Sequence, residues 1–299
     1  MRIIRYIEDS RVVLAAMTDD HTVYPLPFAD LMDVVREAKK NQLSVFRYIQ
    51  TIISGKQGMK KELVELHLLV PIVAPEVWAS GVTYEKSRDA RNYETSEKID
   101  GQETCYDRVY HAERPEIFFK STAARTVGPN DPVYLRSDSN WQIPEPELGL
   151  VITGEGEIIG YTIGNDMSCR DIEGENPLYL PQAKIWKHSC AIGPAIRLAE
   201  TVDDPYNLQI ICRIYRNGQL VVEESANTRQ LKRRYDELVS FLFRDNEVFD
   251  GTVLLTGTSI VPPNQFTLED GDRIEIEIPE IGVLSNPVKA TVKQTVVNK

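Results

Sequence analysis

Three acidic residues stand where their carboxylates can meet. Glu145 and Glu147 lie two apart in the segment IPEPEL, and Asp166 follows a second apolar stretch in GYTIGNDMSCRD. Side chains two apart on an extended chain point to the same side, and the neighbouring prolines favour the extended form. Carboxylates that face one spot repel unless a proton or a cation lies between them. Three hard oxygen ligands suit Mg²⁺, with Mn²⁺ or Ca²⁺ as alternatives.

A solvated strand edge is the competing explanation for the Glu-x-Glu pair. Strands commonly carry such pairs in contact with water, without any bound metal. Here the pair runs directly into the apolar residues LGLVI and is interrupted by proline. These features favour a buried site, although the spacing alone leaves both explanations open.

The charge of the chain excludes some partners. With 34 basic and 45 acidic residues among 299, the net charge is −11, which disfavours nucleic acid and anionic lipid. An anionic substrate stays possible, because a cation in a pocket reverses the local field. The four cysteines form no C-x-x-C pair, so we expect no thiolate zinc or redox site. Neither a membrane span nor a signal peptide is expected, and we predict a cytoplasmic protein.

Hydrophobic patterning predicts which elements hold these residues. Short strands at 2–7, 11–17 and 22–25, followed by helices near 31–38 and 45–53, predict a small N-terminal α+β domain over 1–70. The remainder, 71–299, is expected to be mainly β and catalytic, with the strands 117–120, 147–153, 157–163, 208–215 and 273–278. Residues 84–113 predict a short helix and a covering loop, and 228–244 predict one amphipathic helix. The fold class is α+β, mainly β.

Five segments occur in an order that resembles the fumarylacetoacetate hydrolase superfamily: RPEIFFK (114–120), PEPELGLVI (144–152), GYTIGNDMSCRD (160–171), AKIWKHSCAIGPAI (183–196) and DGTVLLTGTSIVP (250–262). The resemblance covers about residues 75 to 290. It implies a mixed β-sandwich roll, and a homodimer or homotetramer as the assembly.

The resemblance also implies roles for individual residues. Glu145, Glu147 and Asp166 fall on the metal-ligand positions of the family, and Lys184 falls on its active-site lysine. Gly257 and Thr258 fall on the loop that binds the substrate carboxylate. On their own these two residues would indicate no more than a turn at the end of a strand.

The chain departs from the hydrolases of this family at three positions. Where those enzymes carry a His–Glu dyad that activates water, this sequence has Ser87 and Ala90, neither of which takes a proton from water near neutral pH. The family's glutamine after the ligand aspartate is replaced by Glu173. With these changes the chain most closely resembles one branch, the 2-keto-3-deoxy-D-arabinonate dehydratases.

The resemblance to this branch implies dehydration of a 2-keto-3-deoxy sugar acid to 2,5-dioxopentanoate in pentose catabolism. A 2-oxo acid can chelate a cation that acidifies its C3 protons. Lys184 is then a candidate to remove a C3 proton or to hydrogen-bond the enolate oxygen, and Glu116 a candidate to protonate the departing hydroxyl. An ion pair of Glu116 with Arg114 or Lys120 is an equally simple explanation of that glutamate. Glu85, on the expected covering loop, is a weaker candidate for substrate binding.

Other functions of the superfamily remain open at this stage. An acylpyruvate hydrolase or an oxaloacetate decarboxylase would need another group in place of the dyad. A catalytically silent protein with the same fold is a third possibility, against which the intact acid triad and Lys184 argue. Ser168 and Arg170, beside Asp166 in sequence, are expected to orient a ligand carboxylate.

Overall fold

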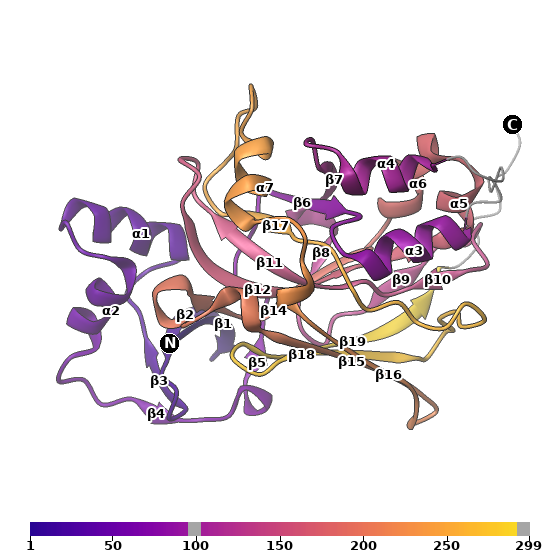
Figure 1. The fold of residues 1–299 in the computed structure, drawn as a ribbon. Helices are drawn as coiled ribbons and strands as arrows, with labels where there is room; N and C mark the ends of the chain where they lie inside the picture. The colour runs from indigo at the N-terminus through magenta and orange to yellow at the C-terminus, as the bar shows by residue number, and fades with distance from the viewer. Residues whose placement is uncertain (95–102, 292–299) are drawn as a thin grey trace, which may run out of the picture.

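Two β-sheets, with helices at both ends of the molecule, form the fold (Figure 1). The computed structural model describes residues 1–94 and 103–291. Within this part of the chain, a 12-stranded sheet stands against a five-stranded sheet, and a two-strand pair lies beside the acidic residues. This architecture confirms the predicted mainly β, α+β fold class.

The large sheet is mostly antiparallel and brings distant segments together. Its spatial order is β4 (Met59–Lys60), β3 (Thr22–Pro25), β2 (Arg11–Met17), β1 (Arg2–Glu8), β14 (Cys190–Leu198), β12 (Ile158–Asp166), β11 (Pro146–Ile152), β17 (Thr252–Leu255), β6 (Glu76–Gly81) and β7 (Glu116–Thr122), with β5 (His67–Leu68) on β1 and β8 (Thr126–Val127) on β14. The strands β11 and β12, which carry or adjoin the three acids, are therefore central neighbours.

The smaller sheet completes the main core. Its order is β16 (Gln219–Asn227), β15 (Gln209–Arg216), β18 (Arg273–Ile278), β19 (Gly282–Ala290) and β9 (Val133–Leu135). Buried side chains such as Leu148 and Ile163 of the large sheet belong to one cluster with Cys212 and Ile274 of the smaller sheet. Burial of this apolar surface is the main favourable term that holds the two sheets together.

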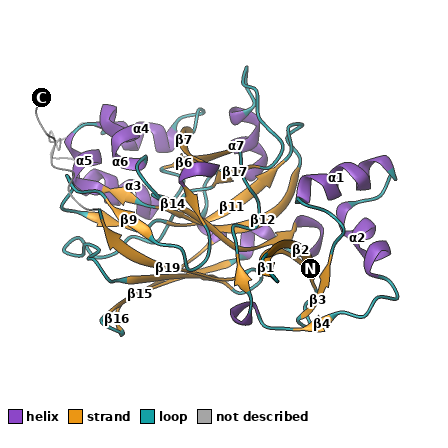
Figure 2. Cartoon of the chain, turned by 180° about the vertical axis from the view of Figure 1, so that it is seen from behind, coloured by secondary structure: helices purple, strands orange, loops and turns teal. Residues whose placement is uncertain are grey.

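Apart from α7 (Tyr235–Leu242), which lies beside β17, the α-helices gather at opposite ends of the large sheet (Figure 2). One end carries α1 (Leu31–Lys40) and α2 (Val45–Ile53); the other carries α3 (Glu85–Glu94), α4 (Cys105–His111), α5 (Arg170–Glu175) and α6 (Leu180–Lys184). The Asp30 side chain caps α1 by accepting from the Met32 backbone N–H at 2.8 Å, and Leu31, Val34 and Ala38 form its buried face. The first end stabilises the fold, and the second surrounds the acidic residues.

The N-terminal 70 residues are continuous with the rest of the large sheet. Arg2 and Ile3 of β1 pair with Arg197 and Ile196 of β14, and Ile3 shares a buried cluster with Leu31 of α1 and Val253 of β17. The predicted strands and helices of this region are present. Whether residues 1–70 form a domain of their own stays a prediction.

The predicted helix over 228–244 is wrong at its start. A 3₁₀ turn covers Thr228–Gln230, and α7 spans Tyr235–Leu242. Tertiary contacts override the helical pattern between them: the Lys232 backbone N–H donates to the Thr83 carbonyl at 3.0 Å, and Arg233 donates to backbone carbonyls of the segment 109–113. The region 84–113 contains two helices, α3 and α4, where one was predicted, and the covering loop falls partly on 95–102, outside the described residues.

Candidate active site

The three predicted ligand residues converge. In the antiparallel pair of β11 and β12, Glu147 stands opposite Gly164, and the Asp166 backbone N–H donates to the Glu145 carbonyl at 3.0 Å. One carboxylate oxygen of each acid lies within 4.8 Å of the others, and all three residues are buried. A solvated strand edge is therefore excluded. Their role as metal ligands stays a prediction.

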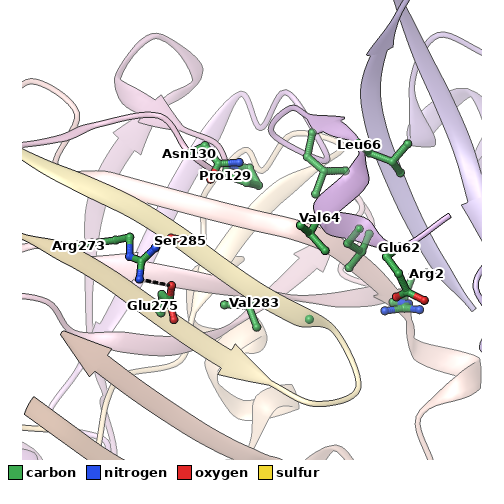
Figure 3. A pocket seen from close by; sticks show the side chains of 13 residues that line it. Arg2, Glu62, Val64, Leu66, Pro129, Asn130, Arg273, Glu275, Val283 and Ser285 are labelled. Atoms are coloured by element: carbon green, nitrogen blue, oxygen red, sulfur yellow. Dashed lines mark ion pairs between the residues drawn. The ribbon is translucent and has the colours of Figure 1, made fainter. Parts of the chain in front are cut away.

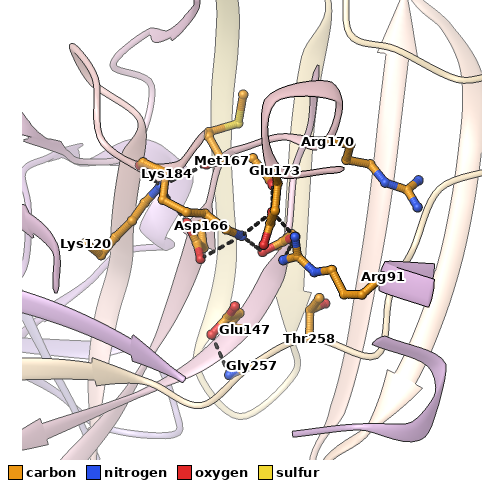
Figure 4. Close-up of polar contacts among 12 residues, drawn as sticks. Arg91, Lys120, Glu147, Asp166, Met167, Arg170, Glu173, Lys184, Gly257 and Thr258 are labelled. Atoms are coloured by element: carbon orange, nitrogen blue, oxygen red, sulfur yellow. Dashed lines mark hydrogen bonds and ion pairs between the residues drawn. The ribbon is translucent and has the colours of Figure 1, made fainter. Parts of the chain in front are cut away.

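Three cationic side chains surround these carboxylates (Figure 4). Lys184 at the end of α6 donates to Glu145 Oε2, and its Nζ lies 3.3 Å from Asp166 Oδ2. Lys120 of β7 places its Nζ 2.5 Å from Asp166 Oδ1, and also donates to the carbonyls of Met167 and Lys184. Arg91 of α3 donates to Glu145 Oε1 at 3.0 Å. Both oxygens of Glu145 thus face a positive charge.

The two glutamates of the triad differ in how readily they ionise. Burial disfavours the charged form of Glu145, but Lys184 and Arg91 outweigh it and lower its pKa to about 2. Burial raises the pKa of Glu147 well above its ordinary value, and the Asp166 and Glu145 carboxylates raise it further. Glu147 therefore needs a nearby cation more than Glu145 does.

The side chains around the cavity carry more negative than positive charge, and a divalent cation would balance the difference. Within the described chain, six carboxylates (Glu94, Glu116, Glu145, Glu147, Asp166 and Glu173) gather there with four cations (Arg91, Lys120, Arg170 and Lys184). Buried charge without compensation is costly, so protons or a cation of charge two must balance the excess. Hard oxygen donors at this spacing fit a divalent cation such as Mg²⁺.

The loop after β17 forms one wall of the site. The Gly257 backbone N–H donates to Glu147 Oε2 at 2.6 Å. Gly257 has a φ of +93°, and a Cβ there would lie 1.9 Å from Thr83 Oγ1, so the position requires glycine. The Thr258 hydroxyl is hydrogen-bonded to backbone groups of Ile260. Both residues line the cavity as predicted, although these donors also serve the protein itself; their substrate-binding role stays a prediction.

Glu116 lies on the strand that borders this cavity. It stands opposite Gly81 in the pairing of β7 and β6, and its Oε2 occupies the space that a Cβ on Gly81 would need, 1.9 Å away. Burial of the carboxyl raises the pKa of Glu116, opposed by Arg91 and Lys184. The alternative ion pairs do not account for Glu116, because Lys120 pairs with Asp166 and Arg114 lies over the Phe241 ring. A carboxyl that retains its proton is a suitable general acid.

A chain of buried ion pairs joins α3 to α5 across the cavity. Arg91 pairs with Glu173, and Glu94 pairs with Arg170, with side chains 1 to 7% exposed. The Ser168 hydroxyl donates to Glu173 at 3.2 Å. Ser168 and Arg170 therefore orient α5 and α3, not Asp166 as predicted; Lys120 holds Asp166 instead. Sequence reasoning missed Arg91, although its spacing of four from Ser87 places both on one helical face.

The cavity enclosed by these groups is small. About 10 Å³ is open to the centre of a water-sized sphere, which is room for about one water molecule. Its walls come from the strand ends and from α3: Ser80, Gly81, Val82, Ser87, Arg91, Phe118, Glu145, Glu147, Asp166, Lys184, Gly257 and Thr258. Neither Glu116 nor Glu85 is among them: the Glu116 carboxylate lies against Gly81 of the wall, whereas the Glu85 carboxylate is 71% exposed and lies 3.3 Å from Arg88. This geometry gives Glu85 no support as a substrate-binding residue.

A second hollow lies on another face, between the segment 62–66 and the hairpin of β18 and β19 (Figure 3). This groove has a volume of about 450 Å³, and Val64 and Val283 border it together with an Arg273–Glu275 ion pair at 3.3 Å. It shares no lining residue with the small cavity. The larger groove therefore does not hold the acidic cluster, and the candidate chemistry belongs to the small cavity.

The fold and the site together define a class. A buried carboxylate triad, a lysine among its acids and a nearby glutamate whose pKa is raised by burial, all on a mixed sheet, suit an enzyme that polarises a small oxo acid through a divalent cation. Residues 85–289 match the family model described as fumarylacetoacetate (FAA) hydrolase C-terminal, which is more than half of the chain. The chain belongs to this family.

Two similar proteins and one similar solved structure carry the name of a sugar-acid dehydratase. The chain is 45% identical to a "Probable 2-keto-3-deoxyxylonate dehydratase" of Haloferax volcanii over 90% of this chain and 93% of that protein. It is 40% identical to a "2-dehydro-3-deoxy-D-arabinonate dehydratase" of Saccharolobus solfataricus over 99% and 98%. A solved structure of a 2-keto-3-deoxy-D-arabinonate dehydratase complexed with magnesium and 2,5-dioxopentanoate matches with a TM-score of 0.83 and 37% identity, over 98% of this chain and 100% of that one.

Proposed function

We propose that this chain is a metal-dependent 2-keto-3-deoxy-D-arabinonate dehydratase, which removes water from the sugar acid to give 2,5-dioxopentanoate. The observation that carries the proposal is the buried triad of Glu145, Glu147 and Asp166, with Lys184 between two of them. Relatives that cover nearly the whole chain bear this activity in their names. Glu145, Glu147 and Asp166 would hold a divalent cation, which would supply polarisation of the keto group and so acidify the C3 protons.

Lys184 handles the proton at C3. Burial would lower its pKa, but the carboxylates of Asp166 and Glu145 outweigh burial and raise it. While these carboxylates keep their full charge, Lys184 is a hydrogen-bond donor to the oxygen that becomes negative. Once part of that charge is neutralised, the amine can accept the proton from C3. In both roles Lys184 Nζ stays next to the Glu145 carboxylate.

Glu116 completes the elimination. Lys184 in its amine form takes the C3 proton, the electrons of the C3–H bond form the C3–C4 double bond, the C4–O bond breaks, and the Glu116 proton leaves with the hydroxyl as water. A proton shift along C3, C4 and C5 then converts the C5 alcohol carbon into the aldehyde. The water-activating dyad of related hydrolases is not needed. Ser87 lies in the cavity wall and Ala90 is outside it, so neither position offers a base for hydrolysis.

A product assay tests this proposal. The protein is incubated with 2-keto-3-deoxy-D-arabinonate and Mg²⁺, and in parallel with an acylpyruvate and with oxaloacetate. We expect 2,5-dioxopentanoate from the sugar acid, and no product after chelation of the metal. Pyruvate with a second acid from the acylpyruvate, or pyruvate and CO₂ from oxaloacetate, at rates above dehydration would reject the proposal.

Several finer features belong to the same proposal. We take Mg²⁺ as the physiological ion because of the hard carboxylate set, with Mn²⁺ or Ca²⁺ as replacements. A place in pentose catabolism, a homodimer or homotetramer, a cytoplasmic location and a boundary near residue 70 remain proposals. None of the helices in the described part of the chain is long and apolar enough to cross a membrane.

A further inference from the structure

Helix α3 presents two polar side chains to the cavity. Ser87 and Arg91 are four residues apart, so they lie on one face of the helix, one turn from each other. Both are buried, at 7% and 6% exposure, and both line the cavity. Ser87 therefore borders the ligand space from α3.

The other polar side chains that line the cavity lie near the acid triad or the Gly257 loop. Lys184 is bonded to the acid triad, and the Thr258 hydroxyl is bonded to Ile260. Ser80 stands beside Gly257, since the Ser80 carbonyl lies 2.8 Å from where a Gly257 Cβ would be. Arg91 is held by Glu145 and Glu173. Two serine hydroxyls remain among the described lining residues: that of Ser80 on β6, which is buried without a hydrogen-bond partner, and that of Ser87 on α3.

The spacing along α3 matches the length of the proposed substrate. Arg91 contacts the triad through Glu145, and Ser87 is one helical turn farther along, a rise of about 5.4 to 6 Å. In a 2-keto-3-deoxy pentonate, four bonds of about 1.5 Å separate the keto carbon from the C5 hydroxyl oxygen, which gives a reach of roughly 5 Å. The cavity as it stands has room for about one water molecule, so binding of this acid requires its wall to open; held at the triad by its keto end, the acid would then extend its hydroxylated end towards Ser87.

We propose that Ser87 is a specificity residue that binds the terminal hydroxyl of a hydroxylated 2-oxo acid, while Arg91 positions α3 over the cavity. This inference rests on the proposed function and deepens it. A serine hydroxyl both donates and accepts, so it suits an alcohol better than a carboxylate or an alkyl chain. Ser87 then favours sugar acids over apolar 2-oxo acids at the same metal-binding triad.

Two inhibitors separate this role from general binding. 2-Oxopentanoate has the five carbons of the substrate but no hydroxyl, whereas 5-hydroxy-2-oxopentanoate keeps the C5 hydroxyl and lacks the C4 leaving group. Inhibition constants are measured against the Mg²⁺-loaded protein for both compounds. With the native chain, we expect the hydroxylated inhibitor to bind about tenfold more tightly, the usual value of one hydrogen bond.

The variant Ser87→Ala should abolish that difference. We expect equal inhibition constants for the two compounds, an unchanged constant for 2-oxopentanoate and an about tenfold loss in kcat/KM for the sugar acid. Lys86→Ala, on the exposed side of the same helix, is the matched control and should retain the tenfold preference. Alanine favours a helix, and Ser87→Cys provides a second variant of nearly the same size.

Two results would overturn the inference. In the first, Ser87→Ala retains the preference for the hydroxylated inhibitor. In the second, both inhibition constants rise in parallel, which would indicate a general distortion of the site. Failure of the dehydratase proposal is separately visible, because the inhibitors report binding without turnover, whereas formation of 2,5-dioxopentanoate by the native chain reports the reaction.

Discussion

The cavity lies between two regions that are held in different ways: the ends of two sheet strands, here called the floor, and helix α3, here called the roof. The floor is formed by the end of β12 and the start of β11, two central neighbouring strands of the large sheet, and its acids are fixed by backbone pairing. The roof is the helix α3, which is held by side-chain ion pairs of Arg91 and Glu94 with α5. The positions of residues on paired strands are fixed by the sheet. A helix held by a few side-chain ion pairs can carry different residues at the positions that face the cavity.

This difference separates reaction type from substrate choice. Under the proposed function, the strand-borne carboxylates would bind the feature that all substrates share, which is the 2-oxo acid. Ser87 and Arg91 of the helix, which line the cavity in place of a base for water, would meet the part of the substrate that varies. One fold can therefore support several reactions by changing one helix.

The largest effect is expected on the floor, for Glu147→Gln. The loss of one of three ligands should lower kcat/KM by at least about 10³-fold and weaken Mg²⁺ binding in calorimetric titration, by more than the 10- to 100-fold typical of outer residues. The metal-free variant should be more stable than the native chain, because the repulsion of Glu147 by Asp166 and Glu145 disappears. Glu155→Gln, on the surface, is the control. Unaltered turnover would place the active centre elsewhere.

A smaller loss is expected at the border between floor and roof, for Glu116→Gln. Without its general acid the reaction should slow by about 10²- to 10³-fold in kcat, with KM nearly unchanged. Gly81→Ala should reproduce part of this loss, because the new Cβ displaces the Glu116 carboxyl. Steady-state kinetics and Mg²⁺ titration test both variants. A change in metal affinity as large as the change in kcat would contradict the assigned role.

The roof should respond mainly in stability. Arg91→Met removes the nearest cation of the buried Glu173 and leaves Lys184, 3.9 Å away, which should cost about 3 kcal/mol in the free energy of unfolding, the lower end for a broken buried pair. Glu173→Gln removes the opposite charge, so the double variant should be less destabilised than the sum of the single changes. Denaturant unfolding of the four proteins gives the coupling energy. Simple additivity would mean that the pair does not hold α3 in place.

The sequence predicted the floor far better than the roof. Period-two spacing and flanking prolines placed Glu145 and Glu147 on one side of the chain, because strand geometry is local, and the family resemblance then indicated that they form a metal site with Asp166. The partner of Arg91 could not be read from the chain, since Glu173 is 82 positions away and no short-range rule joins them. The break at residues 231–234 was hidden for the same reason: long-range contacts of Lys232 and Arg233 override an apolar stripe typical of a helix.

The pH dependence of Mg²⁺ binding tests the floor separately from the roof. Glu147 holds its proton above its ordinary pKa of 4.5 in the metal-free protein, and it must lose that proton to become a ligand. Mg²⁺ affinity should therefore rise by up to about tenfold per pH unit between 4.5 and the raised pKa, while the metal-free protein loses stability over the same window. Glu147→Gln should remove this slope, and Lys86→Ala should retain it. Isothermal titration at several pH values measures both.

The smallest effect is expected for Glu85→Ala, on the outward side of the roof. The Glu85 carboxylate is exposed and pairs with Arg88 on the same helix, an interaction worth little in water. We expect kcat/KM within twofold of the native value and the same preference for the hydroxylated inhibitor. Because Glu85 and Ser87 are only two positions apart, a large loss in Glu85→Ala would mean that α3 turns a different face to the bound substrate. The assignment of Ser87 would then fail together with that of the inward face.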